Sequence, residues 1–298
     1  MVDRGEQTVR IERAAGTAVW EGIQHALGSR GLPGRLARAL QRIGPEASLF
    51  AEARRRTVHH NDFTRAFAVA EPLSIAGDDL YDGGISMLER VTLAQLLRFA
   101  KPRRLVEIGT YRGITTRLML DNAPADARIW TIDLPEDVRS TDSLTHASDE
   151  RLIRTREVGW SYKRHPAASR VQQVFGDSRD PDTWRVISKD VDFAFIDASH
   201  SYEAVKADTL RLLDHLTEDA VVLWHDYSTA STSGRGVGRY LREQMRGWLG
   251  LFLVAGTSLG IRIPENALRR QAARVREYFP AEDYDARRPR GAFPWLGI

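Results

Sequence analysis

The residues best suited to chemistry stand where short apolar segments end. One segment runs into Glu107–Gly113, the next ends at Asp133, and a third is followed by Asp177 and Ser178. If these segments are parallel strands, their carboxyl ends share one edge of a sheet, where a glycine-rich turn lets backbone approach a ligand. An acidic side chain at the second end can accept both hydroxyls of a ribose, and the third end suits an adenine. Together the three ends predict a nucleoside-binding site.

Each of these features also has a plainer interpretation. Gly109 and Gly113 could do no more than form a tight turn, and an aspartate that follows a strand is more often a helix cap. The prediction of a nucleoside site therefore depends on all three strand ends occurring in succession.

The spacing of the glycines indicates which nucleoside is bound. A dinucleotide site requires G-x-G-x-x-G, which seats a pyrophosphate on a helix N-terminus. This turn instead has the spacing G-x-x-x-G, from Gly109 to Gly113, and Glu107 precedes the first glycine by two residues. A carboxylate there would repel a pyrophosphate but attract the cationic amino group of a methionine moiety. The spacing therefore favours S-adenosylmethionine over a nicotinamide dinucleotide.

Histidine and aspartate follow two more apolar segments. The fourth segment runs into Asp197, with His200 three residues later, and the fifth runs into His225 and Asp226. Carboxylates that chelate a hard cation can lower the pKa of a bound hydroxyl group, and a neutral imidazole can accept its proton. This combination suits methyl transfer to oxygen, which requires a nucleophile stronger than a neutral hydroxyl.

Five segments in this order resemble the class I S-adenosylmethionine-dependent methyltransferases: EIGTYRG, TIDLPED, FGDS, FIDASHSYEAVKAD and VVLWHDY. More narrowly, they resemble the branch that includes macrolide-sugar O-methyltransferases, with catechol O-methyltransferases as more distant relatives. The resemblance covers roughly residues 85–263. It implies an enzyme that methylates a hydroxyl group of a small molecule, such as a sugar, a phenol or another secondary metabolite.

The resemblance also implies a role for each residue at the strand ends. Asp133 would bind the ribose of S-adenosylmethionine, while Asp177 and Ser178 would bind its adenine. Asp197 would contact the cofactor as well. The methionine end would be held by the residues of the first turn: Glu107, Gly109, Thr110, Tyr111 and Gly113.

The resemblance assigns a Mg²⁺ ion, or another divalent cation, to Asp197 and Asp226, and the role of general base to His200. Metal-dependent relatives commonly have two successive acidic or amide residues where this chain has His225-Asp226. Histidine is a poorer Mg²⁺ ligand than an oxygen donor, so His225 would bind a softer ion, act as a second acid or base, or lie beneath the site. The plainer interpretation of His200 is a capping or hydrogen-bonded histidine at the start of the following helix.

The elements that position these residues alternate between strand and helix patterns. Strand patterns separated by helices predict βαβ units and a parallel sheet, and the segment LFLVAGTSLGIRI predicts a closing antiparallel hairpin. The expected fold is α/β and Rossmann-like, with seven mostly parallel strands. We expect a helical N-terminal extension over residues 1–80, the cofactor domain over 81–264, and a C-terminal helix with an Arg/Pro-rich tail over 265–298.

One connection between strands is unusually long, from Asp133 to Arg170. Long connections in compact domains are usually functional or disordered. Trp160 and Tyr162 favour a lid that covers a ligand.

Composition excludes several classes of partner and site. The 298 residues include no cysteine, which excludes disulfides and thiolate metal sites. The net charge is only +3, with acidic and basic residues interspersed, so we expect no nucleic-acid partner. No apolar run is long enough to cross a membrane, and we expect a cytoplasmic protein. A helical extension often forms a dimer interface, so a homodimer remains open.

Other functions remain open at this stage. The same fold and cofactor could serve metal-independent methylation of nitrogen or carbon. A nicotinamide-dependent dehydrogenase is a further alternative, against which the missing G-x-G-x-x-G counts. A non-catalytic nucleoside-binding protein would keep the cofactor residues, although a histidine at the position of the base would then have no purpose.

Overall fold

The computed structural model describes residues 49, 52–54, 56–76, 84–138, 151–154, 157–227 and 235–269. The chain divides into two compact units, residues 1–55 and 56–298, and the elements below all belong to the second. Most of the predicted N-terminal extension and the Arg/Pro-rich tail lie outside the described residues. The domain boundaries at residues 80 and 264 stay predictions.

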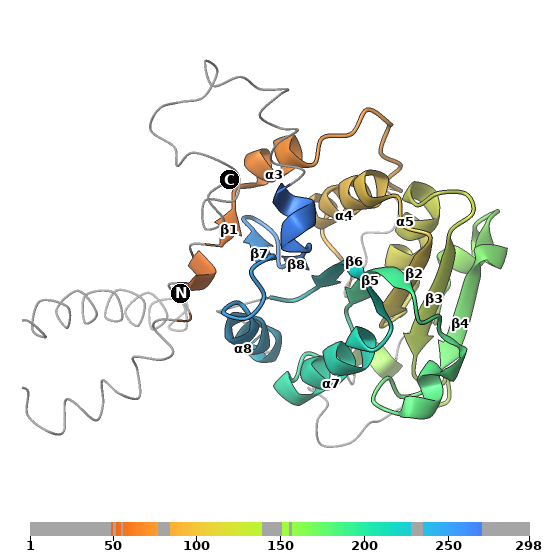
Figure 1. The fold of residues 1–298 in the computed structure, drawn as a ribbon. Helices are drawn as coiled ribbons and strands as arrows, with labels where there is room; N and C mark the ends of the chain where they lie inside the picture. The colour runs from red at the N-terminus through yellow and green to blue at the C-terminus, as the bar shows by residue number, and fades with distance from the viewer. Residues whose placement is uncertain are drawn as a thin grey trace, which may run out of the picture. The chain divides into compact units, whose positions relative to one another are not determined.

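A single mixed sheet forms the centre of the second unit (Figure 1). Its strands follow one another in the order β1-β7-β8-β6-β5-β2-β3-β4. Only β8 runs antiparallel to its neighbours, β6 and β7. The bounds are β1 Thr57–Val58, β2 Arg104–Ile108, β3 Arg128–Asp133, β4 Val171–Phe175, β5 Val191–Ile196, β6 Leu216–Trp224, β7 Leu251–Val254 and β8 Gly260–Arg262.

The predicted α/β fold, with a mostly parallel sheet and a C-terminal antiparallel hairpin, is confirmed. The described sheet has eight strands because the two-residue strand β1 pairs in parallel with β7. So short a strand leaves no periodic pattern in the sequence.

Helices cover both faces of the sheet (Figure 1). On one face α4 lies beside α5, and on the other α7 lies beside α8. The bounds of the helices are α3 His60–Ala66, α4 Met87–Ala100, α5 Ile114–Asn122, α7 Tyr202–Leu213 and α8 Arg235–Gln244, with 3₁₀ turns η1 Tyr162–Arg164, η2 Ala168–Arg170 and η3 Pro181–Val186. Because both faces are covered, the central strands are almost continuously apolar; Phe193, Ala194 and Phe195 of β5 are fully buried. None of the helices in the described part of the chain is both long and apolar enough to cross a bilayer.

The order of the strands decides where a ligand can bind. After β2 the chain adds β3 and β4 on one side, and then returns to add β5 and β6 on the other. Loops leaving β2 and β5 therefore diverge, and ligands of such sheets bind at this switch point, outside the carboxyl ends of the strands. The predicted site residues all lie at or just after the carboxyl ends of β2, β3, β4, β5 and β6.

Candidate active site

The turn after β2 is a compact loop that is bonded to the neighbouring strand. Gly109 has a φ of 99° and Gly113, which precedes α5, has a φ of 72°, conformations that favour glycine. The amide of Gly109 donates to the carbonyl of Ile132, at 2.9 Å. The amide of Tyr111 donates to Oδ2 of Asp133, at 2.7 Å. The turn and the end of β3, predicted to bind one ligand, are thus joined directly.

Glu107 lies beneath this turn and is 1% exposed. Its Oε2 accepts hydrogen bonds from the hydroxyls of Thr116 and Thr131, each at 2.5 Å. Burial raises the pKa of Glu107 to about 8, and the nearby carboxylates of Asp197 and Asp133 act in the same direction. Its Oε1 is buried and has no hydrogen-bond partner among the described residues. The carboxyl group therefore keeps one oxygen for a donor from outside the protein.

The described part of the long connection packs on the glycine-rich turn. The amide of Gly159 donates to the carbonyl of Tyr111 at 2.9 Å, and that of Ser161 donates to the carbonyl of Arg112 at 2.8 Å. The hydroxyl of Tyr162 donates to Oε1 of Gln173 at 3.0 Å. These contacts agree with a loop that covers the glycine-rich turn. Residues 139–150 of the same connection lie outside the described part of the chain.

A chain of hydrogen bonds continues from this loop to the buried carboxyl group. Nε2 of Gln173 donates to Oγ1 of Thr110 at 3.0 Å. The Thr110 hydroxyl lies 2.7 Å from that of Thr131, which donates to Glu107. Gln173 and Thr131 were not predicted as site residues. Gln173 stands in none of the segments that carry the resemblance, and Thr131 opens the segment TIDLPED, in which only Asp133 was given a role.

Asp177 and Ser178, the two residues expected to bind the adenine, form an ion pair and a hydrogen bond with other side chains of the protein. Arg179 forms a bidentate ion pair with Asp177, with Nη2 2.6 Å from Oδ2, and this pairing lowers the pKa of Asp177. The hydroxyl of Ser178 donates to Oδ1 of Asp208 at 2.6 Å. Asp208 is 1% exposed, and burial raises its pKa to about 7. The role of Asp177 and Ser178 at the adenine stays a prediction.

His200 and Asp226 face one another across the ends of β5 and β6. Nε2 of His200 forms an ion pair with Oδ2 of Asp226. Asp226 has a φ of 56°, a strained conformation for a residue with a side chain and one that clusters at functional sites. The following helix, α7, is capped by Ser201, whose hydroxyl accepts the amide of Ala204 at 3.2 Å. His200 does not supply this cap. Its ion pair with Asp226 fits both a hydrogen-bonded histidine at the start of the helix and a general base, so the role of His200 stays a prediction.

His225 lies at the centre of a group of acidic side chains. Its Nδ1 is 3.1 Å from Oδ1 of Asp197 and 3.3 Å from Oδ2 of Asp226. Its Nε2 is 3.3 Å from Oε2 of Glu89 and 3.2 Å from the hydroxyl of Ser258. Burial alone would disfavour a charge on His225, but Asp197, Asp226 and Glu89 together raise its pKa well above the usual value.

Glu89 belongs to the site although no sequence feature predicted it there. It is 4% exposed, in the first turn of α4. Although burial opposes its charge, His225 and Ser258 hold the pKa of Glu89 well below its ordinary value. The pattern Ser86-x-x-Glu89 forms a capping box and was available as a signal, but it points to a helix start rather than to a site.

The donor set suits a divalent cation. Asp197, His225 and Asp226 each offer one ligand atom, and these atoms lie within 4.8 Å of one another. Two carboxylate oxygens and one imidazole nitrogen that face a common point can ligate Mn²⁺ or Zn²⁺ as well as Mg²⁺. The structure therefore brings together the three predicted metal ligands, with the predicted base beside them.

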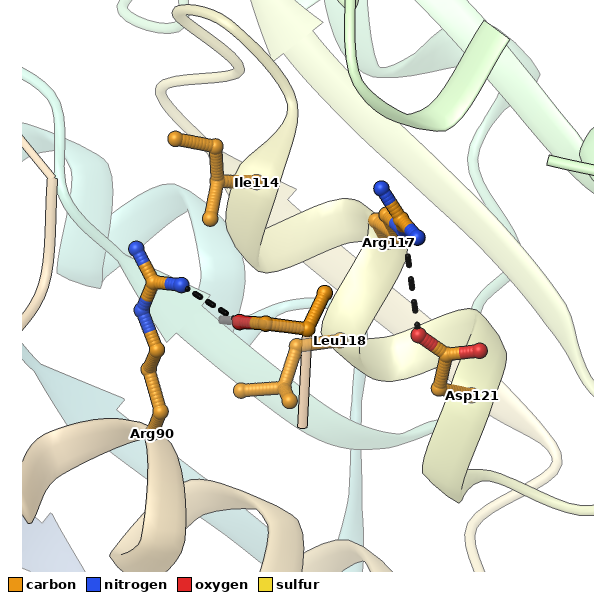
Figure 2. Close-up of a pocket in the computed structure, with 6 residues that line it drawn as sticks. Arg90, Ile114, Arg117, Leu118 and Asp121 are labelled. Atoms are coloured by element: carbon orange, nitrogen blue, oxygen red, sulfur yellow. Dashed lines mark hydrogen bonds and ion pairs between the residues drawn. The ribbon is translucent and has the colours of Figure 1, made fainter. Parts of the chain in front are cut away.

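A small hollow lies elsewhere, along α4 and α5 (Figure 2). Arg90 reaches across it to the carbonyl of Ala76 at 2.9 Å, and Arg117 pairs with Asp121. None of the predicted site residues lines this hollow, whose lining consists of Ala76, Arg90, Ile114, Arg117, Leu118 and Asp121.

Solved structures with a similar fold include several methyltransferases. The O-methyltransferase TomG from Streptomyces achromogenes, solved with SAM, is 19% identical over 72% of this chain and 89% of its own, with a TM-score of 0.45. The SAH-bound methyltransferase PaMTH1 from Podospora anserina is 15% identical over 89% of this chain and 98% of its own, with a TM-score of 0.47. No curated protein sequence matches the chain.

Residues 106–227 match the model of a methyltransferase-domain family. The matched segment begins within β2 and ends after Asp226, so it contains the glycine-rich turn and all five strand ends described above. The strand order and the residues at those strand ends agree with this match, which assigns residues 106–227 to a methyltransferase domain.

Proposed function

We propose that the protein transfers a methyl group from S-adenosylmethionine to a hydroxyl oxygen of a small molecule. The observation that carries this proposal is the pairing of His200 with Asp226 beside Asp197 and His225, at adjacent strand ends next to the glycine-rich turn. Methylation of a hydroxyl group requires a general base, and side chains that bind a cation next to this base assist the loss of the hydroxyl proton.

The residues of the turn support S-adenosylmethionine as the methyl donor. When bound, this cofactor supplies a methyl group on a positively charged sulfur. The buried Oε1 of Glu107 accepts no hydrogen bond from the described residues and would accept one from the ammonium group of the methionine moiety. Asp133 is the last residue of β3, at the neighbouring strand end, where it would accept the ribose hydroxyls.

The cluster at β5 and β6 would hold the divalent cation through Asp197, Asp226 and Nδ1 of His225. Such a cation, when bound, lowers the pKa of a hydroxyl group that it coordinates. Because the three side chains leave β5 and β6, two strands paired in parallel, the rigid sheet sets the spacing of the ligands.

His200 is the residue that would accept the proton of the acceptor. Asp226 accepts from Nε2–H of His200, an arrangement in which the second ring nitrogen acts as the base. With S-adenosylmethionine bound, His200 would take the hydroxyl proton as the methyl group passes from sulfur to the acceptor oxygen, so that a methyl ether and S-adenosylhomocysteine would be the products.

The direct test is calorimetric titration of S-adenosylmethionine into chelator-treated protein, repeated with Mg²⁺ and with Mn²⁺. Micromolar binding that is lost in Asp133→Ala supports the assigned cofactor site. Heat from the metal that is lost in Asp197→Asn supports the assigned metal site. If S-adenosylmethionine binds under no condition, the proposal is wrong and a nucleoside-binding protein without this activity becomes the better interpretation.

A second candidate is metal-independent methylation of nitrogen or carbon. It is favoured by the ion pairs of His225, since a protonated imidazole between Asp197, Asp226 and Glu89 balances part of their charge without a metal. Chelator distinguishes the two candidates once an acceptor has been found: O-methylation by the metal-bound site stops, whereas the alternative reaction continues unchanged.

A further inference from the structure

We infer that Glu89 is a positioning residue for the metal site: it holds the ring of His225 so that Nε2 carries a proton and Nδ1 is directed at the cation. This inference rests on the metal site of the proposed function. It adds a residue from α4, outside the matched domain, to a site otherwise built from β5 and β6.

The hydrogen bonds around Nε2 of His225 make this nitrogen a donor. Oε2 of Glu89 lies 3.3 Å away, and a carboxylate can only accept. The Ser258 hydroxyl lies 3.2 Å from Nε2, but its own proton is donated to Oε1 of Glu89, at 2.6 Å. Both neighbours of Nε2 are therefore acceptors, and Nε2 carries a proton.

The opposite nitrogen then has the orientation of a metal ligand. Nδ1 lies 3.1 Å from Asp197 and 3.3 Å from Asp226, and both carboxylate oxygens can only accept, so a proton on Nδ1 is directed at them when no cation is bound. A cation between these three atoms would replace this proton and leave the proton on Nε2 in place. A ligating histidine that donates its other N–H to a carboxylate is a recurrent arrangement in metal sites, where the carboxylate sets the orientation of the ring.

Glu89 is itself held in place by three donors besides His225. The amide of Ser86 donates to Oε2 at 2.7 Å. The amide of Ser258 donates to Oε1 at 2.7 Å, in addition to its hydroxyl. Every position around the carboxylate is thus occupied by a donor, and α4 is joined to the β7–β8 turn across the site.

This surrounding makes Glu89→Gln an informative variant. The amide of glutamine replaces one acceptor oxygen by an NH₂ group, which must face either the Ser86 and His225 donors or the Ser258 donors. The volume of the side chain is unchanged. We expect the variant to bind Mn²⁺ 10- to 100-fold more weakly than the wild-type chain, the usual effect of losing such a carboxylate.

The experiment titrates Mn²⁺ into the chelator-treated full chain and follows the free ion by electron paramagnetic resonance. Ser86→Ala is the matched control, because it removes the reciprocal bond of the same capping box, from the Glu89 amide to the Ser86 hydroxyl at 3.4 Å, without touching His225. It should lower the thermal midpoint and leave the affinity for Mn²⁺ unchanged. In a His225→Ala background, Glu89→Gln should cause no additional loss of affinity.

A second measurement reports directly which ring nitrogen of His225 carries the proton. Long-range ¹⁵N–¹H spectra of the Mg²⁺-loaded protein should show His225 protonated at Nε2 in the wild type, and a mixture of tautomers in Glu89→Gln. If Glu89→Gln does not fold, Ser258→Ala takes its place, because it removes the other acceptor at Nε2, and a smaller loss of affinity is expected.

The Mn²⁺ titrations distinguish an error in the metal site from an error in the role of Glu89. If the wild-type chain binds no Mn²⁺, the metal site itself is wrong, and the role of Glu89 falls with it. If the wild type binds Mn²⁺, His225→Ala weakens the binding and Glu89→Gln does not, then the metal site stands and Glu89 is only a helix cap.

Discussion

Gly109 meets the backbone of Asp197 so closely that a Cβ atom at position 109 would lie 2.1 Å from the carbonyl oxygen of Asp197. The amide of Asp197 also donates to the carbonyl of Ile108, at 2.8 Å. The glycine therefore allows the turn after β2 to touch the end of β5. This contact brings the proposed cofactor turn next to the proposed metal ligand.

Gly109→Ala should destabilise the protein by at least about 2 kcal/mol, because the φ of 99° is strained for alanine and the backbone of Asp197 would have to move. Urea unfolding measures the change. Gly247→Ala is the control, since its new Cβ would have its nearest neighbour, the carbonyl oxygen of Gln244, at 3.8 Å; it should change the free energy of unfolding by less than about 1 kcal/mol. Equal effects of the two variants would contradict the prediction.

His200→Ala should lower kcat by about 10²- to 10⁴-fold, the usual contribution of a positioned general base. The affinity for S-adenosylmethionine should stay within a factor of two or so of the wild-type value, since His200 is expected to act on the acceptor. Steady-state kinetics measure kcat, and calorimetry measures the affinity for S-adenosylmethionine. An unchanged kcat would remove His200 from the proton transfer.

Asp208→Asn should change how stability depends on pH. Burial raises the pKa of Asp208 to about 7 in the folded chain, against an ordinary value of 3.8. Between these values the folded state keeps a proton that the unfolded state releases, so the free energy of unfolding falls as the pH rises. The variant should show a shallower fall between about pH 4 and pH 7, and should gain stability relative to the wild type above that window.

Denaturant unfolding at several pH values tests this prediction. Asp214→Asn serves as the control, because it changes an exposed carboxylate just after the same helix, α7. The control should follow the slope of the wild type. An Asp208→Asn curve parallel to that of the wild type would show that Asp208 does not titrate in this window.

Tyr162→Phe should cost about 0.5–1.5 kcal/mol of stability, because it removes the hydrogen bond to Gln173 while preserving the buried ring. Thermal unfolding gives the size of the loss. Gln173→Leu should remove the same bond, so the double variant should cost much less than the sum of the two single ones. Fully additive losses would mean that the two side chains act independently.

The sequence alone determined the parallel strands and the residues that follow them. The segments predicted as strands correspond to β2 to β6, because strands of a parallel sheet that is covered on both faces are mostly apolar and end in polar turns. Since parallel strands share one edge, the predicted neighbourhood of Asp197, His225 and Asp226 could be deduced before any coordinate was known.

Tertiary structure alone decided how these side chains are held. Glu89 contacts His225 from helix α4, and Ser258 contacts it from the β7–β8 turn. Local patterns could not reveal either contact, because a capping box looks the same whether its glutamate faces solvent or a buried imidazole. Spacing along the chain specifies elements and their ends, whereas the partner of a buried polar group depends on which elements pack together.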